Sequence, residues 1–217
     1  MRRAANYLSG NPMRGYRVAQ PNEIYDRYLT RAISEINELT GEILRCSRCR
    51  HARTMPVIGS GHPMADIFLL KYQARPSELH EGVAFFGRAG AALMKSCQRL
   101  KIDPLQLYGT NVVKCGDVRE SRPEARCLEH LRRELATVGP KLIVAMGEDT
   151  VVALNNAAVP LSRPLEYRPG EIAEFTPGIQ VLMTPDIDAS LDEQRLKAEF
   201  WRAFRRLGEW YDGIPPY

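Results

Sequence analysis

The stretch Leu107–Cys115 reads Leu-Tyr-Gly-Thr-Asn-Val-Val-Lys-Cys, an apolar run that closes with a cation and a thiol. Its length and its β-branched residues predict a buried central strand. Because side chains alternate along a strand, Asn111 and Cys115 are expected on one face, about 13 Å apart. Open α/β sheets bind ligands outside the carboxyl ends of their strands, so Asn111 is a candidate pocket residue. The alternative for Asn111 is a capped turn after a core strand.

Strands and helices alternate on both sides of this stretch. The apolar run Ala65–Leu70 is too short for a helix and predicts another central strand, as does Lys141–Met146. The remaining expected elements are helices over Pro21–Arg45, Ala91–Leu100, Pro123–Val138 and Leu191–Trp210, a polar loop over Lys71–Ala84, a loop or hairpin over Pro160–Pro177 and a strand over Gln180–Met183. The βαβαβα order predicts an α/β fold, with helices on both faces of a central, mostly parallel sheet.

The length and the charge distribution of the chain predict one domain that follows a basic N-terminal arm. The chain has 217 residues, of which 44% are hydrophobic, enough to bury one core over residues 21–217. Residues 1–20 form a basic N-terminal arm that holds Arg2, Arg3, Arg14 and Arg17 and no acidic residue. This arm can contact a nucleic-acid backbone or an acidic partner, or remain a solvated tail. No run of about 18 apolar residues and no apolar signal core is present, so we expect a cytoplasmic protein without a membrane partner.

Four of the five cysteines are candidates for one metal site. Cys97 falls in a helical pattern and is interpreted as a small buried apolar residue. Two pairs remain, Cys46 with Cys49 and Cys115 with Cys127. Disulfides are rare in the cytoplasm, so these pairs indicate a four-thiolate site. Zinc and a [4Fe-4S] cluster both bind four cysteines, and spacing alone does not separate them.

Several motifs occur in the order found in the iron-sulfur uracil-DNA glycosylases known as family four, which the chain resembles over roughly residues 30 to 205. These motifs are Cys46-x2-Cys49, Val57–Gly61, Ala65–Ile67, Phe85–Gly90, Thr110–Cys115 and Pro140–Gly147. The resemblance implies the three-layer α/β/α uracil-DNA glycosylase fold. It implies DNA as the partner, single-stranded or with a flipped base, and it favours a [4Fe-4S] cluster on the four cysteines.

The resemblance also assigns residues of the site. Phe85 matches the aromatic residue that stacks on the extruded base, and Asn111 matches the amide that reads its Watson-Crick edge. The family's catalytic Glu position is Tyr72 here, and the histidine of its second catalytic segment is replaced by Asp186. Two glycines of the catalytic loop are replaced by Lys71 and Arg75, which are expected either to bind DNA phosphate or to block the pocket.

Three hypotheses remain. The first is a catalytically degenerate, DNA-binding iron-sulfur protein that acts in DNA recognition or as a subunit of a DNA-processing assembly. The second is an active DNA glycosylase for uracil or another damaged base, with relocated catalytic groups among Glu78, His80, Glu81 and Asp186. The third is a structural module that binds other proteins.

Overall fold

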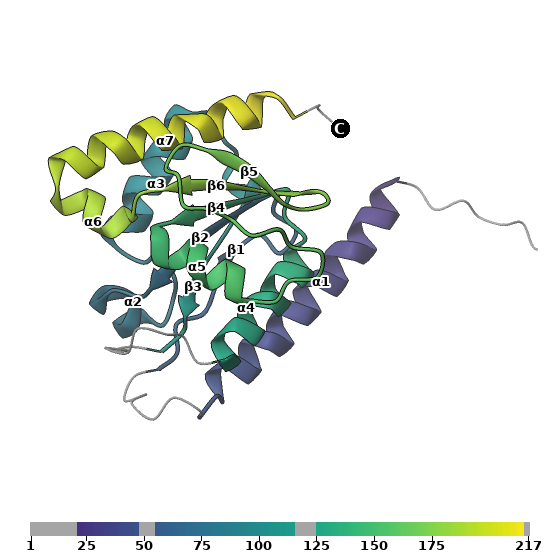
Figure 1. Ribbon diagram of the computed structural model, residues 1–217. Helices are drawn as coiled ribbons and strands as arrows, with labels where there is room; N and C mark the ends of the chain where they lie inside the picture. Colours follow the sequence, from purple (N-terminus) through teal and green to yellow (C-terminus); the bar gives the residue numbers. More distant parts are fainter. Residues whose placement is uncertain (1–20, 48–54, 116–124, 215–217) are drawn as a thin grey trace, which may run out of the picture.

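The computed structural model describes residues 21–47, 55–115 and 125–214. Within them, six strands form one sheet in the order β1-β3-β2-β4-β6-β5 (Figure 1). The bounds are β1 Ser60–Gly61, β2 Ile67–Gln73, β3 Leu107–Val113, β4 Leu142–Met146, β5 Ile172–Thr176 and β6 Ile179–Thr184. The four inner strands are parallel, and β1 and β5 pair antiparallel at the two edges. The predicted mostly parallel sheet is confirmed.

Helices cover both faces of this sheet (Figure 1). Their bounds are α1 Pro21–Leu44, α2 Pro76–Glu81, α3 Arg88–Arg99, α4 Ala125–Val138, α5 Glu148–Asn156, α6 Ile187–Asp192 and α7 Gln194–Asp212. One core lies between the sheet and helices α4 and α5, and α1 packs outside α4. A second core lies between the opposite face and helices α3, α6 and α7. The fold is therefore the predicted three-layer α/β/α arrangement.

Along each inner strand, alternate residues enter the two cores. In β2, Phe68 and Leu70 pack toward α4 and α5, whereas Ile67 and Leu69 pack toward α3 and α7. Strands buried on both faces need apolar residues at every position, which explains their continuous apolar runs in the sequence. No helix in the described ranges is both long and apolar enough to cross a membrane.

Three expected boundaries are corrected. The predicted polar loop over Lys71–Ala84 is wrong at its start, because β2 continues to Gln73 and helix α2 follows. The predicted single helix over Leu191–Trp210 is two helices, separated at Glu193, whose backbone is extended. The predicted strand over Leu107–Cys115 ends at Val113, two residues before Cys115, and the shared face of Asn111 and Cys115 stays a prediction. Within Pro160–Pro177, the hairpin alternative is confirmed by the pairing of β5 with β6.

Candidate functional site

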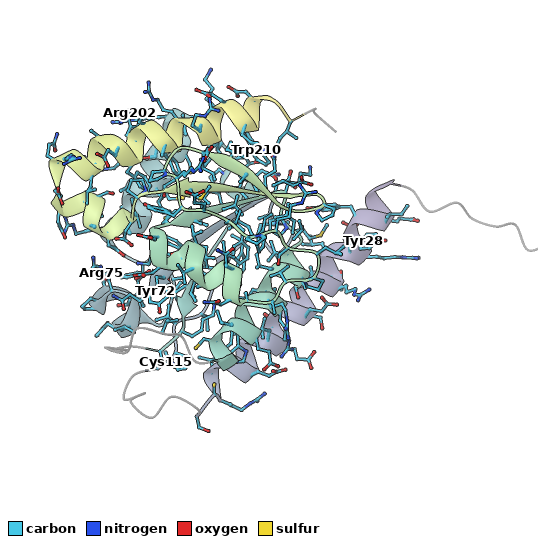
Figure 2. The ribbon with its side chains drawn as sticks, in the orientation of Figure 1. Tyr28, Tyr72, Arg75, Cys115, Arg202 and Trp210 are labelled. Atoms are coloured by element: carbon cyan, nitrogen blue, oxygen red, sulfur yellow. The ribbon has the colours of Figure 1, made fainter. Side chains whose placement is uncertain are left out.

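A cleft of about 300 Å³ lies at the carboxyl edge of the sheet, where β2, β4 and β6 end. Its lining residues are Tyr72, Gln73, Arg75, Met146, Gly147, Glu148, Asp149, Asp186 and Asp188. Figure 2 labels Tyr72 and Arg75 beside each other at this edge. Four carboxyl side chains face one guanidinium, so the cleft favours a neutral or cationic group over a phosphate.

A buried ion-pair network lies directly behind this cleft. Lys71, near the end of β2, donates from Nζ to Glu78 Oε2 at 2.6 Å and to Asp188 Oδ2 at 2.8 Å. The Lys71 and Glu78 side chains are each 1% exposed. Arg75 Nε reaches Asp188 Oδ2 at 3.3 Å from the outer side, and its side chain is 46% exposed. The network therefore joins β2, α2 and α6 through three buried or nearly buried charges.

Glu78 also fixes the loop that carries Phe85. Its Oε2 accepts the backbone N–H of Arg75 at 2.7 Å, and its Oε1 accepts the backbone N–H of Phe85. Phe85 has a φ of 60°, a conformation that side-chain-bearing residues rarely adopt, and the second bond holds it there. Because both oxygens are buried and occupied, Glu78 is poorly placed to act as a general base toward water.

Phe85 and Asn111 lie with Lys71 on one face of the sheet. The Phe85 ring packs on Gly109, where an added Cβ would lie 2.7 Å from the ring, so only glycine permits this approach. Lys71 Nζ is 5.5 Å from the centre of that ring. Asn111 is the β3 partner of Lys71 in the parallel pairing, and Gly109 lies two residues earlier on the same face.

The Asn111 side chain is fully buried and its amide is unsatisfied. Within the described residues, neither its Oδ1 nor its Nδ2 has a hydrogen-bond partner. An unpaired buried polar group costs about 1–3 kcal/mol, so such a group in a native structure requires an explanation. A ligand that pairs with this amide would supply one, whereas a capped turn would have satisfied it locally.

The two catalytic positions assigned by resemblance both line the cleft. Burial, with Asp149 and Cys127 nearby, raises the pKa of the half-buried Tyr72 above its ordinary value, so its phenol stays neutral near pH 7. Asp186 begins helix α6, where its Oδ1 accepts the backbone N–H of Ala189 at 2.7 Å. Burial raises the pKa of Asp186, although that hydrogen bond acts in the opposite direction.

The other proposed relocated groups lie on α2. His80 and Glu81 are exposed, and His80 Nδ1 is 3.1 Å from Glu81 Oε1. Neither residue belongs to the cleft lining. The expectation that Lys71 contacts DNA phosphate is corrected, because its ammonium is buried and paired with two carboxylates. Arg75 keeps an exposed guanidinium at the rim, and Arg2, Arg3, Arg14 and Arg17 lie outside the described residues.

The family model described as "Uracil DNA glycosylase superfamily" matches residues 58–205, which include every lining residue of the cleft. The chain belongs to the uracil-DNA glycosylase superfamily. Three similar proteins carry the name "Type-4 uracil-DNA glycosylase". The protein of Archaeoglobus fulgidus is 25% identical over 187 residues, covering 82% of this chain and 94% of the relative. Those of Pyrobaculum aerophilum and Thermotoga maritima are 27% and 29% identical, covering 55% and 52% of this chain and 64% and 62% of the relatives.

In this superfamily member, three of the four candidate metal ligands are described. Cys46 follows α1, Cys115 follows β3 and Cys127 lies in the first turn of α4. The end of α1, the start of α4 and the end of β3 lie at one end of the molecule (Figure 1), where Figure 2 labels Cys115. Cys49 lies outside the described residues, and within them no three metal-binding side chains are grouped as a site. The four-cysteine site stays a prediction.

The sequence reasoning did not predict that two lysines are buried, one of which, Lys71, it had expected at the DNA-binding site. Lys71 and Lys114 each end an apolar run, at the carboxyl ends of β2 and β3. Lys114 Nζ pairs with Glu134 Oε2 and contacts Thr110, and Tyr108 OH donates to Glu134 Oε1 at 3.1 Å, on the face of the sheet covered by α4. The available signal was the position of each lysine in the sequence: Lys71 directly follows four apolar residues, and Lys114 directly follows two. Lysine is seldom fully buried unless it is paired, so such a pattern calls for an acidic partner.

Proposed function

We propose that this protein binds DNA and holds an extruded base between Phe85 and Asn111 without excising uracil. The observation that carries the proposal is the buried, unsatisfied amide of Asn111 on the same sheet face as the Phe85 ring. A flipped base presents donors and acceptors to an amide and a flat surface to an aromatic ring. The superfamily membership of the chain supports DNA as the source of that base.

The lining of the cleft argues against excision. Breaking a glycosidic bond requires a group that activates water and a group that stabilises the negative charge of the departing base. Tyr72 is a neutral phenol, and an ionised Asp186 would place negative charge beside a developing anion. Loss of a general base typically costs about 10² to 10⁴ in rate, and loss of an oxyanion donor about 10² to 10³.

A [4Fe-4S] cluster on Cys46, Cys49, Cys115 and Cys127 belongs to the same proposal, with zinc as the alternative. The donor set supports it, because three of these thiols come from segments that meet at one end of the molecule. Bound there, a cluster would cross-link α1, β3 and α4 and so act structurally. Its cysteines must be reduced thiolates, which agrees with a cytoplasmic location.

The DNA backbone is proposed to contact the basic arm of residues 1–20 and the rim residue Arg75. The arm supplies Arg2, Arg3, Arg14 and Arg17, and the cleft itself is acidic. Phosphates would therefore remain outside the cleft, whose lining includes neither Phe85 nor Asn111, while a neutral base passes inward to those two residues. A protein that contacts the DNA backbone at its surface and a base in its interior could act as the recognition subunit of a DNA-processing assembly.

The test combines binding with single-turnover cleavage. Labelled single and double strands, with and without uracil, are titrated with protein, and excess protein is then incubated with the uracil strands. We expect binding that is stronger with an extrudable base, no excision within minutes, and loss of that preference in Asn111→Ala but not in the exposed control Asn156→Ala. Complete excision that Asn111→Ala and Asp186→Ala abolish would show an active glycosylase. Absence of any DNA binding would favour the protein-interaction module.

A further inference from the structure

Lys71 places a primary amine one side chain behind the cleft. Its Nζ contacts Asp188, and Asp188 itself lines the cleft with a side chain that is 11% exposed. The residue in front of Asp188 is Arg75, whose Nε is 3.3 Å from Asp188 Oδ2 and whose side chain is 46% exposed. Arg75 is the more exposed of the two cations that contact Asp188, so a substrate must displace its guanidinium to approach Lys71. The network that buries Lys71 therefore also holds its amine near the position where a bound nucleotide would enter.

We propose that Lys71 forms an imine with the aldehyde of an abasic deoxyribose, giving the protein a DNA lyase activity that requires no base excision of its own. The proposal rests on the proposed binding of DNA at this cleft. A lysine must lose a proton before it reacts with a carbonyl group, and Asp188, which contacts the Lys71 ammonium and lines the cleft, is the available acceptor. The substrate aldehyde is the product of hydrolytic base removal, so an active glycosylase or spontaneous base loss must supply it.

The reaction balances without an oxidant or a reductant. The Lys71 ammonium first transfers a proton to the carboxylate of Asp188, whose Oδ2 is 2.8 Å from Nζ and which lines the cleft. The amine then forms a bond to C1′ of the ring-opened sugar, and the carbonyl oxygen takes up a proton from the nitrogen. That oxygen leaves as water with the proton held by the carboxylic acid, which generates a protonated imine. A carboxylate next removes a C2′ proton, and the C3′–O bond breaks, so the 3′ phosphate departs with the electron pair. Water finally hydrolyses the imine and regenerates the amine.

The electrostatics of the cleft suit each species in this sequence. The protonated imine carries one positive charge on the same nitrogen as the resting ammonium, so Glu78 and Asp188 can pair with it in the same way. The acidic lining favours that cation and a neutral sugar, and it disfavours a phosphate inside the cleft. A volume of about 300 Å³ is at the lower end for a ligand site and leaves room for one deoxyribose.

The chain provides a matched control in Lys114. Like Lys71, it is a fully buried lysine at the end of a central strand and is paired with a buried glutamate. Its side chain lies on the opposite face of the sheet, among Thr110 and Glu134, and it does not line the cleft. Burial and pairing are thus shared by both lysines, and neither lines the cleft, but only Lys71 contacts a carboxylate, Asp188, that does.

The experiment traps the imine by reduction. Full-length protein is incubated with a duplex that contains one abasic site, with and without sodium cyanoborohydride, and the covalent product is digested and mapped by mass spectrometry. We expect a reduced adduct on Lys71 and, without reductant, strand cleavage 3′ to the site. Lys71→Arg keeps the cation but cannot form an imine, so adduct and cleavage should fall to the level without protein. Lys114→Arg should retain both.

Absence of an adduct, or an adduct that maps to Lys114, another lysine or the Met1 amine, would overturn the proposal. Because the mapping is made on the unsubstituted protein, the result does not depend on the folding of Lys71→Arg. Anisotropy with the same duplex separates the two proposals. DNA binding without an adduct would contradict the proposed lyase activity alone. Absence of DNA binding would contradict the proposed function as well.

Discussion

Lys71 and Asn111 are partners in the parallel pairing of β2 with β3, and their side chains leave the same face of the sheet. The Lys71 ammonium is neutralised by two carboxylates, whereas the Asn111 amide has no hydrogen-bond partner in the described part of the chain. One of these adjacent buried polar groups is therefore satisfied by the protein, and the other is left without a partner in the described residues. Their substitution should have opposite effects on stability.

Replacing Lys71 by Met should destabilise the fold. The change leaves Glu78 and Asp188 buried without their counter-charge, and breaking a buried pair typically costs about 3–5 kcal/mol. Urea unfolding measures the loss, with Arg195→Ala as a control because its pair with Glu199 is exposed. Adding Glu78→Gln and Asp188→Asn to Lys71→Met should recover part of the stability. An unchanged midpoint in Lys71→Met would contradict the network as described.

Replacing Asn111 by Leu should stabilise the protein and abolish its base-dependent DNA binding. Leucine has a similar size and carries no polar atoms, so the cost of the unsatisfied amide, about 1–3 kcal/mol, is removed. Thermal unfolding and anisotropy with extrudable-base duplexes test the two halves separately. A destabilised variant would mean that the amide is already satisfied in the protein without DNA.

The Asp186→Asn variant should gain stability relative to the natural protein as the pH rises. Burial raises the folded-state pKa of Asp186 above its ordinary value of 3.8. The stability that its neutral form contributes is fully present below that ordinary value and is lost as the pH rises through the raised pKa. Asparagine stays neutral and can still accept from Ala189. Unfolding at several pH values from about 3 to 8 checks this, with the exposed Asp192→Asn as the control; a difference that does not change with pH would refute it.

Deleting residues 1–20 should flatten the salt dependence of DNA binding. Each phosphate contact that is lost lowers the slope of log K against log salt by about 0.7 to 0.9, and the arm holds Arg2, Arg3, Arg14 and Arg17. Arg75→Ala should lower the slope by about one further contact, whereas Lys71→Arg should leave it unchanged because that position is buried. A truncated protein with the original slope would place the backbone contacts elsewhere.

Anaerobically purified protein should be brown and hold about four irons per chain. Cys115→Ser should lose the iron together with the visible absorbance, since it removes a proposed ligand. Cys97→Ser should keep both, because Cys97 is buried in α3 with a pKa raised to about 11 by burial, and it belongs to the opposite core. Colourless protein that contains stoichiometric zinc would show that the site holds zinc and no cluster.

The central sheet was predictable from sequence because its strands are buried on both faces. Runs such as Ala65–Leu70 and Lys141–Met146 have no polar face and no helical spacing, so strand was the consistent interpretation. The resemblance then located Phe85 and Asn111, which the structure places on one face of this sheet. The break between α6 and α7 was not predictable from the apolar spacing, which continues across Glu193.

The ion-pair network was beyond sequence reasoning. Lys71 and Asp188 are 117 residues apart in the chain, and no local pattern joins them. A lysine at the end of an apolar run indicates an ammonium that needs an acidic partner, but it does not indicate which carboxylates supply it. Only the fold shows that two carboxylates from α2 and α6 converge on it.

The same network restricts how the sequence can change. A glycine at position 71, as in the family's loop, would leave Glu78 and Asp188 without their cation, and loss of either carboxylate would weaken the pairing of a buried lysine. Glu at position 72 and His at position 186, as the resemblance expects, would join a site whose inner wall is still an ammonium with two acids. The effects of substitutions at positions 71, 78 and 188 therefore depend on one another. A series of single substitutions toward the glycosylase pattern passes through less stable variants unless these three positions change together.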